Sequence, residues 1–301
     1  MSAISIQHIE KSYGQTLAVS DLCLEIEEGE LFGLIGPDGA GKTSLIRMLT
    51  SLLLPDKGSM HVIGLNPVKD YKLLRTKIGY MPGRFSLYQD LSVEENLSLF
   101  ASLFETTIDD NYGLIEDIYV QLEPFKDRKA GALSGGMKQK LALCCAMIHR
   151  PEILFLDEPT TGVDPVSRKE FWEMLKKLNA DGLTIFVSTP YMDEAGLCGR
   201  VGLIQTGKLL AVDSPQAINH QFGNPLFAVK GNNKHQLLQL LKTHPKCFSA
   251  YSFGSEIHFT ATDSLQVQQL SEWLNEHTSE ETSITTITAG IEDSFMKLMS
   301  K

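Results

Sequence analysis

Short apolar runs alternate with segments of helical periodicity along the first 220 residues of the chain. Four of these runs are ELFGLIG (30–36), ILFLD (153–157), LTIFVST (183–189) and RVGLIQTGKLLAV (200–212). Each is bounded by glycine or polar residues. Apolar runs of this length between turn signals are typical of buried strands. Their alternation with amphipathic helices predicts an α/β fold with a largely parallel sheet covered by helices.

The pattern changes after HQFGNP (220–225). We expect a strand, a helix, two strands, a helix and a strand, at 226–231, 234–244, 247–253, 256–262, 264–277 and 283–289. This order is that of a ferredoxin-like α+β domain. A last helix over 291–300 is expected to close the chain. The sequence therefore predicts a second domain at 221–301.

Composition narrows the class of protein. The chain has 301 residues, a net charge of −10 at pH 7 and 43% apolar residues, which is enough for a hydrophobic core. No run approaches the about 18 apolar residues of a membrane span, and residues 1–11 lack the features of a secretory signal. Five cysteines without CxxC spacing predict reduced thiols and a cytoplasmic location. The acidic balance argues against nucleic acid as the main partner.

A glycine-rich motif, GPDGAGKTS (36–44), follows the first apolar run and precedes helical spacing at Leu45, Leu49 and Leu52. Strand, loop and helix are the required setting of a P-loop, G-x-x-x-x-G-K-[ST], whose N–H groups attract phosphate. The residues expected around the phosphates are Gly36, Asp38, Gly39, Ala40, Gly41, Lys42, Thr43 and Ser44. We expect Lys42 to reach the β- and γ-phosphates of ATP and Thr43 to ligate Mg²⁺. The alternative is an ordinary glycine turn before a helix.

A second motif, PEILFLDEPT (151–160), places two carboxylates after a buried apolar run. The carboxyl ends of strands are where open α/β sheets bind ligands. We expect Asp157 to hold Mg²⁺ through water and Glu158 to polarise the attacking water. Taken alone, the motif would describe only a strand that meets solvent, and the P-loop is what favours the functional interpretation.

A third motif, LSGGMKQKLALCCAMI (133–148), combines a helix cap with two glycines. Ser134 can cap the helix, Gly135 and Gly136 expose backbone N–H groups, and the apolar spacing continues at Leu141, Cys145 and Ile148. These features predict a second helix N-terminus that attracts an anion.

Residues 3–215 resemble the nucleotide-binding subunits of ABC transporters, and the resemblance rests on LSGG, Gln139 and LDEPTTGVDP. STPYMDEA and ITAGIEDSFMKLM resemble exporter cassettes of the daunorubicin-resistance and YbhF types. The resemblance implies a P-loop NTPase cassette at 1–220. It would have a mixed sheet core, an N-terminal antiparallel β subdomain and a helical subdomain at about 84–150. The ferredoxin-like unit at 221–301 would be an accessory domain.

The resemblance also implies partners and further site residues. Tyr13 would stack on adenine, Asp164 would lie at a dimer seam, and residues 85–97 would contact a transmembrane permease subunit. Two cassettes would close head to tail on two ATP molecules. Each site would then take its P-loop and acidic pair from one chain, and Ser134, Gly135, Gly136 and Gln139 from the other. The protein is then expected on the cytoplasmic face of the membrane.

Two positions depart from the family pattern at the γ-phosphate. Gly83 stands where the resemblance places a glutamine, and Pro190 stands where it places a histidine. Each loss of a positioned polar group typically costs about 10²–10³ in rate. We therefore expect a site that binds Mg-ATP and hydrolyses it slowly. Asp38, in place of asparagine, should weaken binding only modestly.

These observations leave several functions open. The chain is expected to be the ATP-binding subunit of an ABC exporter, paired with a complete cassette or as a slow homodimer. A module that responds to nucleotide and regulates or anchors a partner, without productive hydrolysis, is the alternative from another class. A soluble translation or repair ATPase of the same superfamily is a third, and the C-terminal domain could serve dimer contact or regulation.

Overall fold

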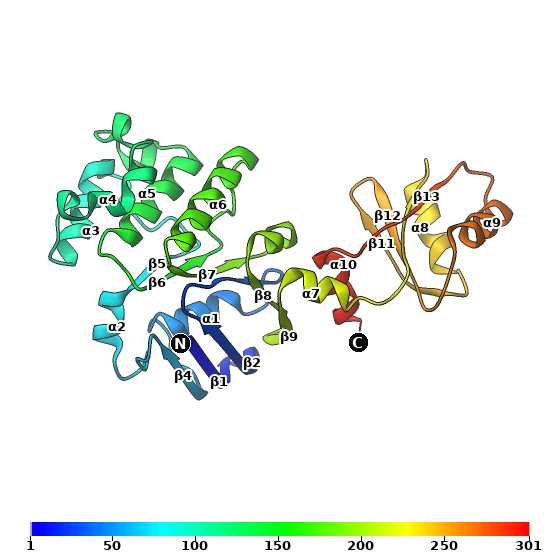
Figure 1. The fold of residues 1–301 in the computed structure, drawn as a ribbon, viewed down its shortest axis with the longest axis horizontal. Helices are drawn as coiled ribbons and strands as arrows, with labels where there is room; N and C mark the ends of the chain where they lie inside the picture. The colour runs from blue at the N-terminus through cyan, green and yellow to red at the C-terminus, as the bar shows by residue number, and fades with distance from the viewer. Residues whose placement is uncertain (1, 301) are drawn as a thin grey trace. The chain divides into compact units, whose positions relative to one another are not determined.

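The computed structural model describes residues 2–300, and the chain divides into two compact units between Ser214 and Pro215. The division lies before the expected boundary at residue 220 because helix α7 (Pro215–His220) packs against α10 (Ile291–Met299). The Ser294 hydroxyl of α10 hydrogen-bonds to Asn219 Oδ1 at 3.1 Å. Figure 1 shows the elements of each unit.

A six-stranded sheet forms the centre of the first unit, with the strand order β5-β6-β7-β3-β8-β9. Its strands are β3 (Leu31–Ile35), β5 (Ile78–Met81), β6 (Ile153–Asp157), β7 (Thr184–Thr189), β8 (Arg200–Gln205) and β9 (Lys208–Asp213). All neighbours are parallel except β8 and β9, which form an antiparallel hairpin. The carboxyl ends of β3, β6 and β7 therefore meet at one edge of the sheet.

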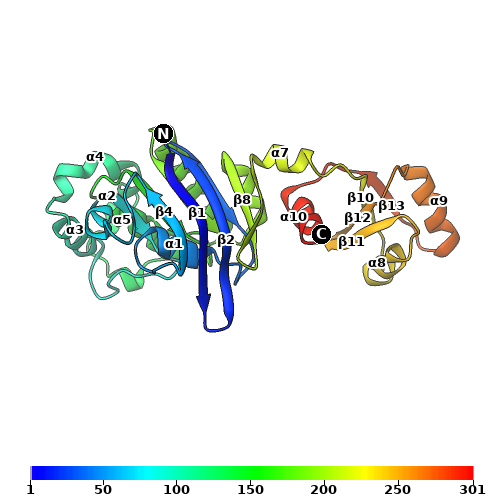
Figure 2. The same cartoon turned by 90° about the horizontal axis from the view of Figure 1, so that it is seen from below.

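A second, antiparallel sheet is formed by β1 (Ser2–Tyr13), β2 (Thr16–Glu27) and β4 (Lys57–Val62), in the order β2-β1-β4. Figure 2 shows β1 and β2 side by side as a long hairpin. This sheet confirms the N-terminal antiparallel β subdomain that the resemblance implied. The central sheet is mixed, as was also expected.

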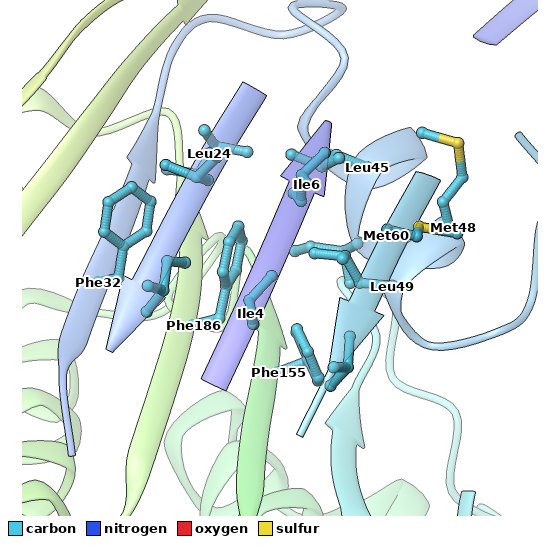
Figure 3. Packing of buried hydrophobic residues seen from close by; sticks show 14 of the residues in the cluster. Ile4, Ile6, Leu24, Phe32, Leu45, Met48, Leu49, Met60, Phe155 and Phe186 are labelled. Carbon is cyan, nitrogen blue, oxygen red and sulfur yellow. The ribbon is translucent and has the colours of Figure 1, made fainter. Parts of the chain in front are cut away.

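The main hydrophobic core lies between these two sheets and α1 (Lys42–Leu49). Figure 3 shows its side chains, with Phe155 and Phe186 of the central sheet close to Ile4 of β1 and Leu49 of α1. The Phe155 and Phe186 rings are 5.8 Å apart. Burial of Leu45 and Leu49 confirms the predicted helix face.

One residue of that predicted face was placed wrongly. Helix α1 ends at Leu49, whose successor Thr50 donates its hydroxyl back to Ile46 O at 2.9 Å. Leu52 lies beyond the helix and its side chain is 52% exposed. Apolar spacing alone did not reveal where the helix stops.

Helices α3 (Val93–Leu103), α4 (Ile108–Tyr119) and α5 (Gly135–Met147) gather into a helical part of the first unit (Figure 1). α3 and α4 each begin with a capping box, built on Ser92 and on Thr107. Asn111, a non-helical residue within α4, donates its side-chain amide to Ile148 O at 2.8 Å. The short α2 (Tyr71–Lys77) and the long α6 (Pro165–Ala180) complete the unit. No helix among residues 2–300 combines the length and apolarity that a membrane span requires.

The second unit continues with β10 (Leu226–Lys230), α8 (Lys234–Lys242), β11 (Cys247–Phe253), β12 (Glu256–Ala261), α9 (Val267–His277) and β13 (Ser283–Thr286). Its four strands are antiparallel in the order β11-β12-β10-β13. Leu237 and Leu241 of α8, and Leu270 and Leu274 of α9, are buried in one cluster with Phe259. The unit therefore has a hydrophobic core of its own.

Phe155→Ala should lower the free energy of unfolding of the first unit by about 3–5 kcal/mol, because it deletes a fully buried ring and leaves a cavity. Urea titration followed by far-UV circular dichroism measures the loss. Leu103→Ala is the control, since that side chain is 67% exposed and should change stability by less than about 0.5 kcal/mol. Equal effects of the two variants would contradict the assignment of the core.

Candidate functional site

The P-loop connects β3 to α1, and its glycines are required by its geometry. Gly39 and Gly41 have φ of +77° and +105°, which glycine adopts at little cost. A β-carbon at Gly36 would lie 2.1 Å from the carbonyl oxygen of Ile204, and one at Gly41 would lie 2.2 Å from that of Ala18. The backbone can follow this path only where both positions lack a side chain.

The Lys42 side chain is buried and turns back over the loop. Its Nζ donates to Gly36 O at 2.7 Å and to Pro37 O at 3.0 Å. The same Nζ lies 3.1 Å from Glu158 Oε1. The structure thus brings together the P-loop lysine and the second carboxylate of the acidic pair, although they are far apart in sequence.

Asp157 ends β6 and is almost completely buried. Its Oδ1 accepts hydrogen bonds from Thr43 Oγ1 at 3.1 Å and from Ser188 Oγ at 2.7 Å. Asp157 lies opposite Ser188 in the parallel pairing of β6 with β7. The sheet register therefore fixes the carboxylate beside the first turn of α1.

Glu158 follows Asp157 in a left-handed backbone conformation, with φ of +51°. For a residue other than glycine this conformation costs on the order of 1–3 kcal/mol. The Glu158 N–H donates to both Ser188 O at 3.0 Å and Ser188 Oγ at 3.1 Å, which helps to hold the conformation. The turn directs the carboxylate toward Lys42.

The oxygens of Thr43 and Asp157 suit a small, hard cation. Mg²⁺ takes oxygen ligands and is usually held by one or two carboxylates, with substrate phosphates and water completing its shell. Among residues 2–300, no group of three or more His, Cys, Asp or Glu side chains could hold a metal ion. The hydroxyl of Thr43 and the carboxylate of Asp157 are therefore a donor set that fits Mg²⁺.

Two adjoining cavities surround these residues. The first has a volume of about 290 Å³ and is lined by Tyr13, Ala18, residues 38–44 and Glu158. The second has a volume of about 450 Å³ and is lined by Thr43, Arg47, Tyr80, residues 82–84, Asp157 and Glu158. Because the two cavities share Thr43 and Glu158, they adjoin each other at the P-loop and the acidic pair.

Two tyrosines mark these two cavities. Tyr13 ends β1 with a half-exposed ring, and its hydroxyl lies 3.3 Å from Ser44 Oγ in the first cavity. Tyr80 lies in the second cavity, where burial, and after it the charge of Asp157, raise the pKa of its hydroxyl. The positive charge of the nearby Arg47 opposes the shift in this pKa. Arg47 therefore already has a partner within the chain.

The glycine motif of α5 lies elsewhere in the first unit. Ser134 is the N-cap of α5 and its Oγ accepts a hydrogen bond from Met137 N at 3.3 Å, which confirms the predicted cap. A β-carbon at Gly136 would lie 2.5 Å from Ser167 Oγ of α6, so α5 begins against α6. Gly135 stands beside this contact, and Gln139 is half-buried in α5.

Asp164 caps α6 and accepts hydrogen bonds from Val166 N at 3.1 Å and Ser167 N at 3.0 Å. The bond from the Ser167 N–H is the main cause that lowers the pKa of Asp164. Of the predicted site residues, six line neither cavity: Gly36 of the P-loop itself, and Ser134, Gly135, Gly136, Gln139 and Asp164. One chain therefore does not bring the two glycine motifs together.

The two positions that lack a polar side chain both lie beside the acidic pair or the P-loop. Gly83 lines the second cavity, and a β-carbon there would lie 2.9 Å from Asp157 O. Pro190 follows β7, and the preceding residue, Thr189, accepts a hydrogen bond at its carbonyl from Gly36 N at 3.3 Å. The backbone of Asp157 thus leaves little room for any side chain at position 83.

A buried carboxylate holds the loop that follows Pro190. Glu194 is 1% exposed, and its Oε1 accepts from Thr160 Oγ1 at 2.7 Å and from Arg168 Nε at 2.6 Å. Thr189 donates its hydroxyl to the other oxygen of Glu194. The Arg168 guanidinium also lies 4.3 Å from the centre of the Tyr191 ring. This loop is therefore fixed against α6.

Sequence patterns missed several residues around the acidic pair. Ser188 binds Asp157 and the Glu158 N–H, but only the pairing of β6 with β7 places it there. Arg84 directly follows Gly83 and lines the second cavity, but no motif in the sequence predicts this position. The ion pair of Arg168 with Glu194 joins α6 to the loop after Pro190, and no spacing in the sequence marks it.

Comparisons with known proteins agree with this geometry. The family model described as ABC transporter matches residues 19–161. The chain is 43% identical over 241 residues to "Probable multidrug ABC transporter ATP-binding protein YbhF" of Escherichia coli, covering 77% of this chain and 42% of that protein. It is 36% identical over 270 residues to "Nod factor export ATP-binding protein I" of Mesorhizobium japonicum, covering 88% of this chain and 79% of that protein. The chain thus spans less than half the length of the Escherichia coli relative.

Solved structures give the same result. The ATP-binding subunit of an ABC transporter superposes with a TM-score of 0.67 at 25% identity, covering 73% of this chain and 93% of that one. A dimeric bacterial ABC transporter cassette superposes with a TM-score of 0.63 at 25% identity, covering 70% of this chain and 98% of that one.

Arg168→Met should lower the free energy of unfolding of the first unit by about 2 kcal/mol, because it leaves the buried Glu194 carboxylate without its cation. The expected fall in melting temperature is about 4–8 °C by differential scanning calorimetry. Lys177→Met on the same helix is the control, since its ion pair with Asp117 is exposed on both sides. An unchanged midpoint for Arg168→Met would show that Glu194 does not depend on this pair.

Proposed function

Because the chain belongs to the family of ABC transporter ATP-binding proteins, we propose that it couples the binding and hydrolysis of ATP to the movement of membrane permease subunits of an exporter. The observation that carries this proposal is the convergence of Lys42, Asp157 and Glu158 at the junction of the two cavities. The names of the relatives, which describe multidrug transport and Nod factor export, support an export role.

In the proposed site the phosphates of ATP lie on the N–H groups of residues 36–44, at the N-terminus of α1. Lys42 would exchange its carbonyl partners for the β- and γ-phosphates. Tyr13, half-exposed beside Ser44, would stack on the adenine ring. Thr43 and Asp157 would hold Mg²⁺, which neutralises phosphate charge when it is bound.

Hydrolysis places a water molecule between Glu158 and the γ-phosphorus. The water oxygen forms a bond to that phosphorus, and the bond from the phosphorus to the bridging oxygen breaks. The electron pair of the broken bond stays on the ADP oxygen, and Glu158 accepts the proton that the water loses. The products are ADP and inorganic phosphate.

The same site should turn over slowly. Neither Gly83 nor Pro190 offers a side-chain donor to the γ-phosphate, and Pro190 has no N–H. Binding groups are retained, because Lys42, Thr43 and Asp157 are all placed at the cavities. The proposal is therefore an ATP site that binds firmly and has weak intrinsic activity.

A complete site would need a second cassette. Ser134, Gly135, Gly136 and Gln139 line neither cavity, so they would contribute to the site of a partner. The likeness to a dimeric cassette supports this arrangement, with Asp164 at the seam. A partner cassette that carries the glutamine and the histidine absent here would give the dimer one complete site. A homodimer would have two slow sites.

The permease would dock on the helical part of the first unit. A cavity of about 240 Å³ lies between this helical part and the segments around Leu52 and Arg75, with Phe100, Phe104 and His149 among its other lining residues. Leu52, Leu54 and Tyr88 are large apolar side chains exposed in these segments. Residues 85–97, expected to contact the permease, include Tyr88. This docking would hold the protein on the cytoplasmic face of the membrane.

The second unit is proposed to be a ferredoxin-like accessory domain. Its elements follow the strand–helix–strand–strand–helix–strand order, and its sheet order β11-β12-β10-β13 places the first and third strands in the middle. We assign it to dimer contact or to regulation.

The absence of side-chain donors at Gly83 and Pro190 also favours a second candidate. A nucleotide-responsive module would bind ATP, change its contacts with a partner and release no phosphate. Phosphate release by the chain mixed with a complete cassette, lost again on Ser134→Arg, would exclude this candidate.

Lys42→Ala should weaken binding of Mg-ATP by about 10- to 100-fold, because hydrogen bonds to charged phosphates are strong. Isothermal titration calorimetry measures the affinity, and circular dichroism checks the fold. Lys176→Ala, an exposed lysine of α6, should bind as the parent does. Unchanged affinity for Lys42→Ala would exclude the P-loop as the nucleotide site.

Pro190→His should raise the rate of phosphate release by about tenfold or more, because it supplies a donor beside the P-loop. Pro190→Ala is the matched control, since it removes the proline without adding a donor, and it should keep the parental rate. A glutamine at position 83 is a poorer test, because its β-carbon would meet Asp157 O. If both Pro190 variants are equally slow while ATP binding is intact, the missing donor does not limit the rate.

A further inference from the structure

The loop after β5 places one arginine in the second cavity. Arg84 lines this cavity of about 450 Å³ together with Thr43, Asp157 and Glu158. Thr43 and Glu158 also line the P-loop cavity, so the two cavities share a wall. A phosphate chain bound along the P-loop would therefore lie next to the cavity that Arg84 lines.

Four charged side chains line this cavity, and three of them already have partners. Asp157 accepts hydrogen bonds from Thr43 and Ser188, and Glu158 pairs with Lys42. The Arg47 side chain lies near the Tyr80 hydroxyl and opposes the rise in its pKa.

The remaining charged group is Arg84. Across residues 2–300, no carboxylate, carbonyl or hydroxyl engages the Arg84 guanidinium, and this residue is exposed while it lines the cavity. Arg84 is therefore the uncommitted cation of the described cavity lining.

Two positions near the P-loop and the acidic pair lack the donors that phosphoryl transfer would use. Charge in the transition state spreads over three oxygens of the transferred group, and positioned cations stabilise it. Gly83 has no side chain and little room for one, and Pro190 has no donor. Arginine suits this task because its planar fork donates two parallel hydrogen bonds to phosphate oxygens.

We propose that Arg84 contacts the γ-phosphate of ATP and supplies the charge that positions 83 and 190 do not. The inference rests on the proposed ATP site and names a further residue of it. Arg84 transfers no proton; it neutralises charge while Glu158 receives the proton of the attacking water. ADP, which lacks the γ-phosphate, would not reach Arg84.

The test compares Mg-ATP with Mg-ADP by isothermal titration calorimetry, in the full chain carrying Glu158→Gln to suppress hydrolysis. Arg84→Ala should weaken ATP binding by about tenfold and ADP binding by less than about twofold. Arg84→Lys should fall between, because lysine keeps the charge but loses the planar fork. Arg47→Ala is the matched control, since it removes a cation from the same cavity that already has a partner, and it should preserve the ratio of the two affinities.

Turnover gives a second readout without the Glu158→Gln change. Arg84→Ala should lower kcat by about 10²-fold, and adding Pro190→His should recover part of the loss, because the new donor serves the same phosphate. A loss that Pro190→His does not relieve at all would show that the two positions act on different groups.

The outcomes separate this inference from the function on which it rests. If the parent chain binds neither nucleotide, both fail. If the parent binds ATP and ADP through Lys42 but Arg84→Ala leaves their ratio unchanged, the Arg84 contact alone is wrong and the arginine is a solvent or partner contact. If Arg47→Ala lowers the ratio equally, the effect belongs to the overall charge of the cavity, which also overturns the contact.

Discussion

Asp157 joins three segments of the chain at one edge of the central sheet. Its Oδ1 accepts from Thr43 at the start of α1 and from Ser188 of the neighbouring strand β7. Because Asp157 is almost fully buried, each of these bonds is made in a poorly solvated place where an unpaired carboxylate would be costly. This one carboxylate therefore ties the start of α1 to the paired strands β6 and β7, directly before the turn into Glu158.

The backbone turn at Glu158 is held by the strand next to Asp157. A left-handed conformation is unfavourable for glutamate, and the N–H bonds to Ser188 hold it. As a result the carboxylate meets Lys42 at the boundary of the two cavities. Strained backbone conformations of this kind cluster at functional sites, where the surrounding structure over-determines the local backbone. On the other side, Glu194 ties the loop containing Pro190 to Arg168 of α6.

Sequence patterns predicted those helices and strands that depend on neighbouring residues alone. Buried strands β3, β6 and β7 follow from short apolar runs, and the cap of α5 follows from Ser134. The end of α1 was placed wrongly at Leu52, because apolar spacing does not report where backbone hydrogen bonding stops. The boundary between the units moved because α7 packs on α10, a contact between segments far apart in sequence.

The sequence by itself determined the motifs GPDGAGKTS and LDEP, and the missing donors at Gly83 and Pro190, because a residue type is visible without any contact. Only the tertiary structure decided which side chains face each other. Strand order placed Ser188 beside Asp157, and the path of the loop after β5 placed Arg84 in the cavity. Backbone packing also showed that Asp157 O occupies the space a side chain at position 83 would need. These are properties of non-local register and close packing, which spacing along one chain does not specify.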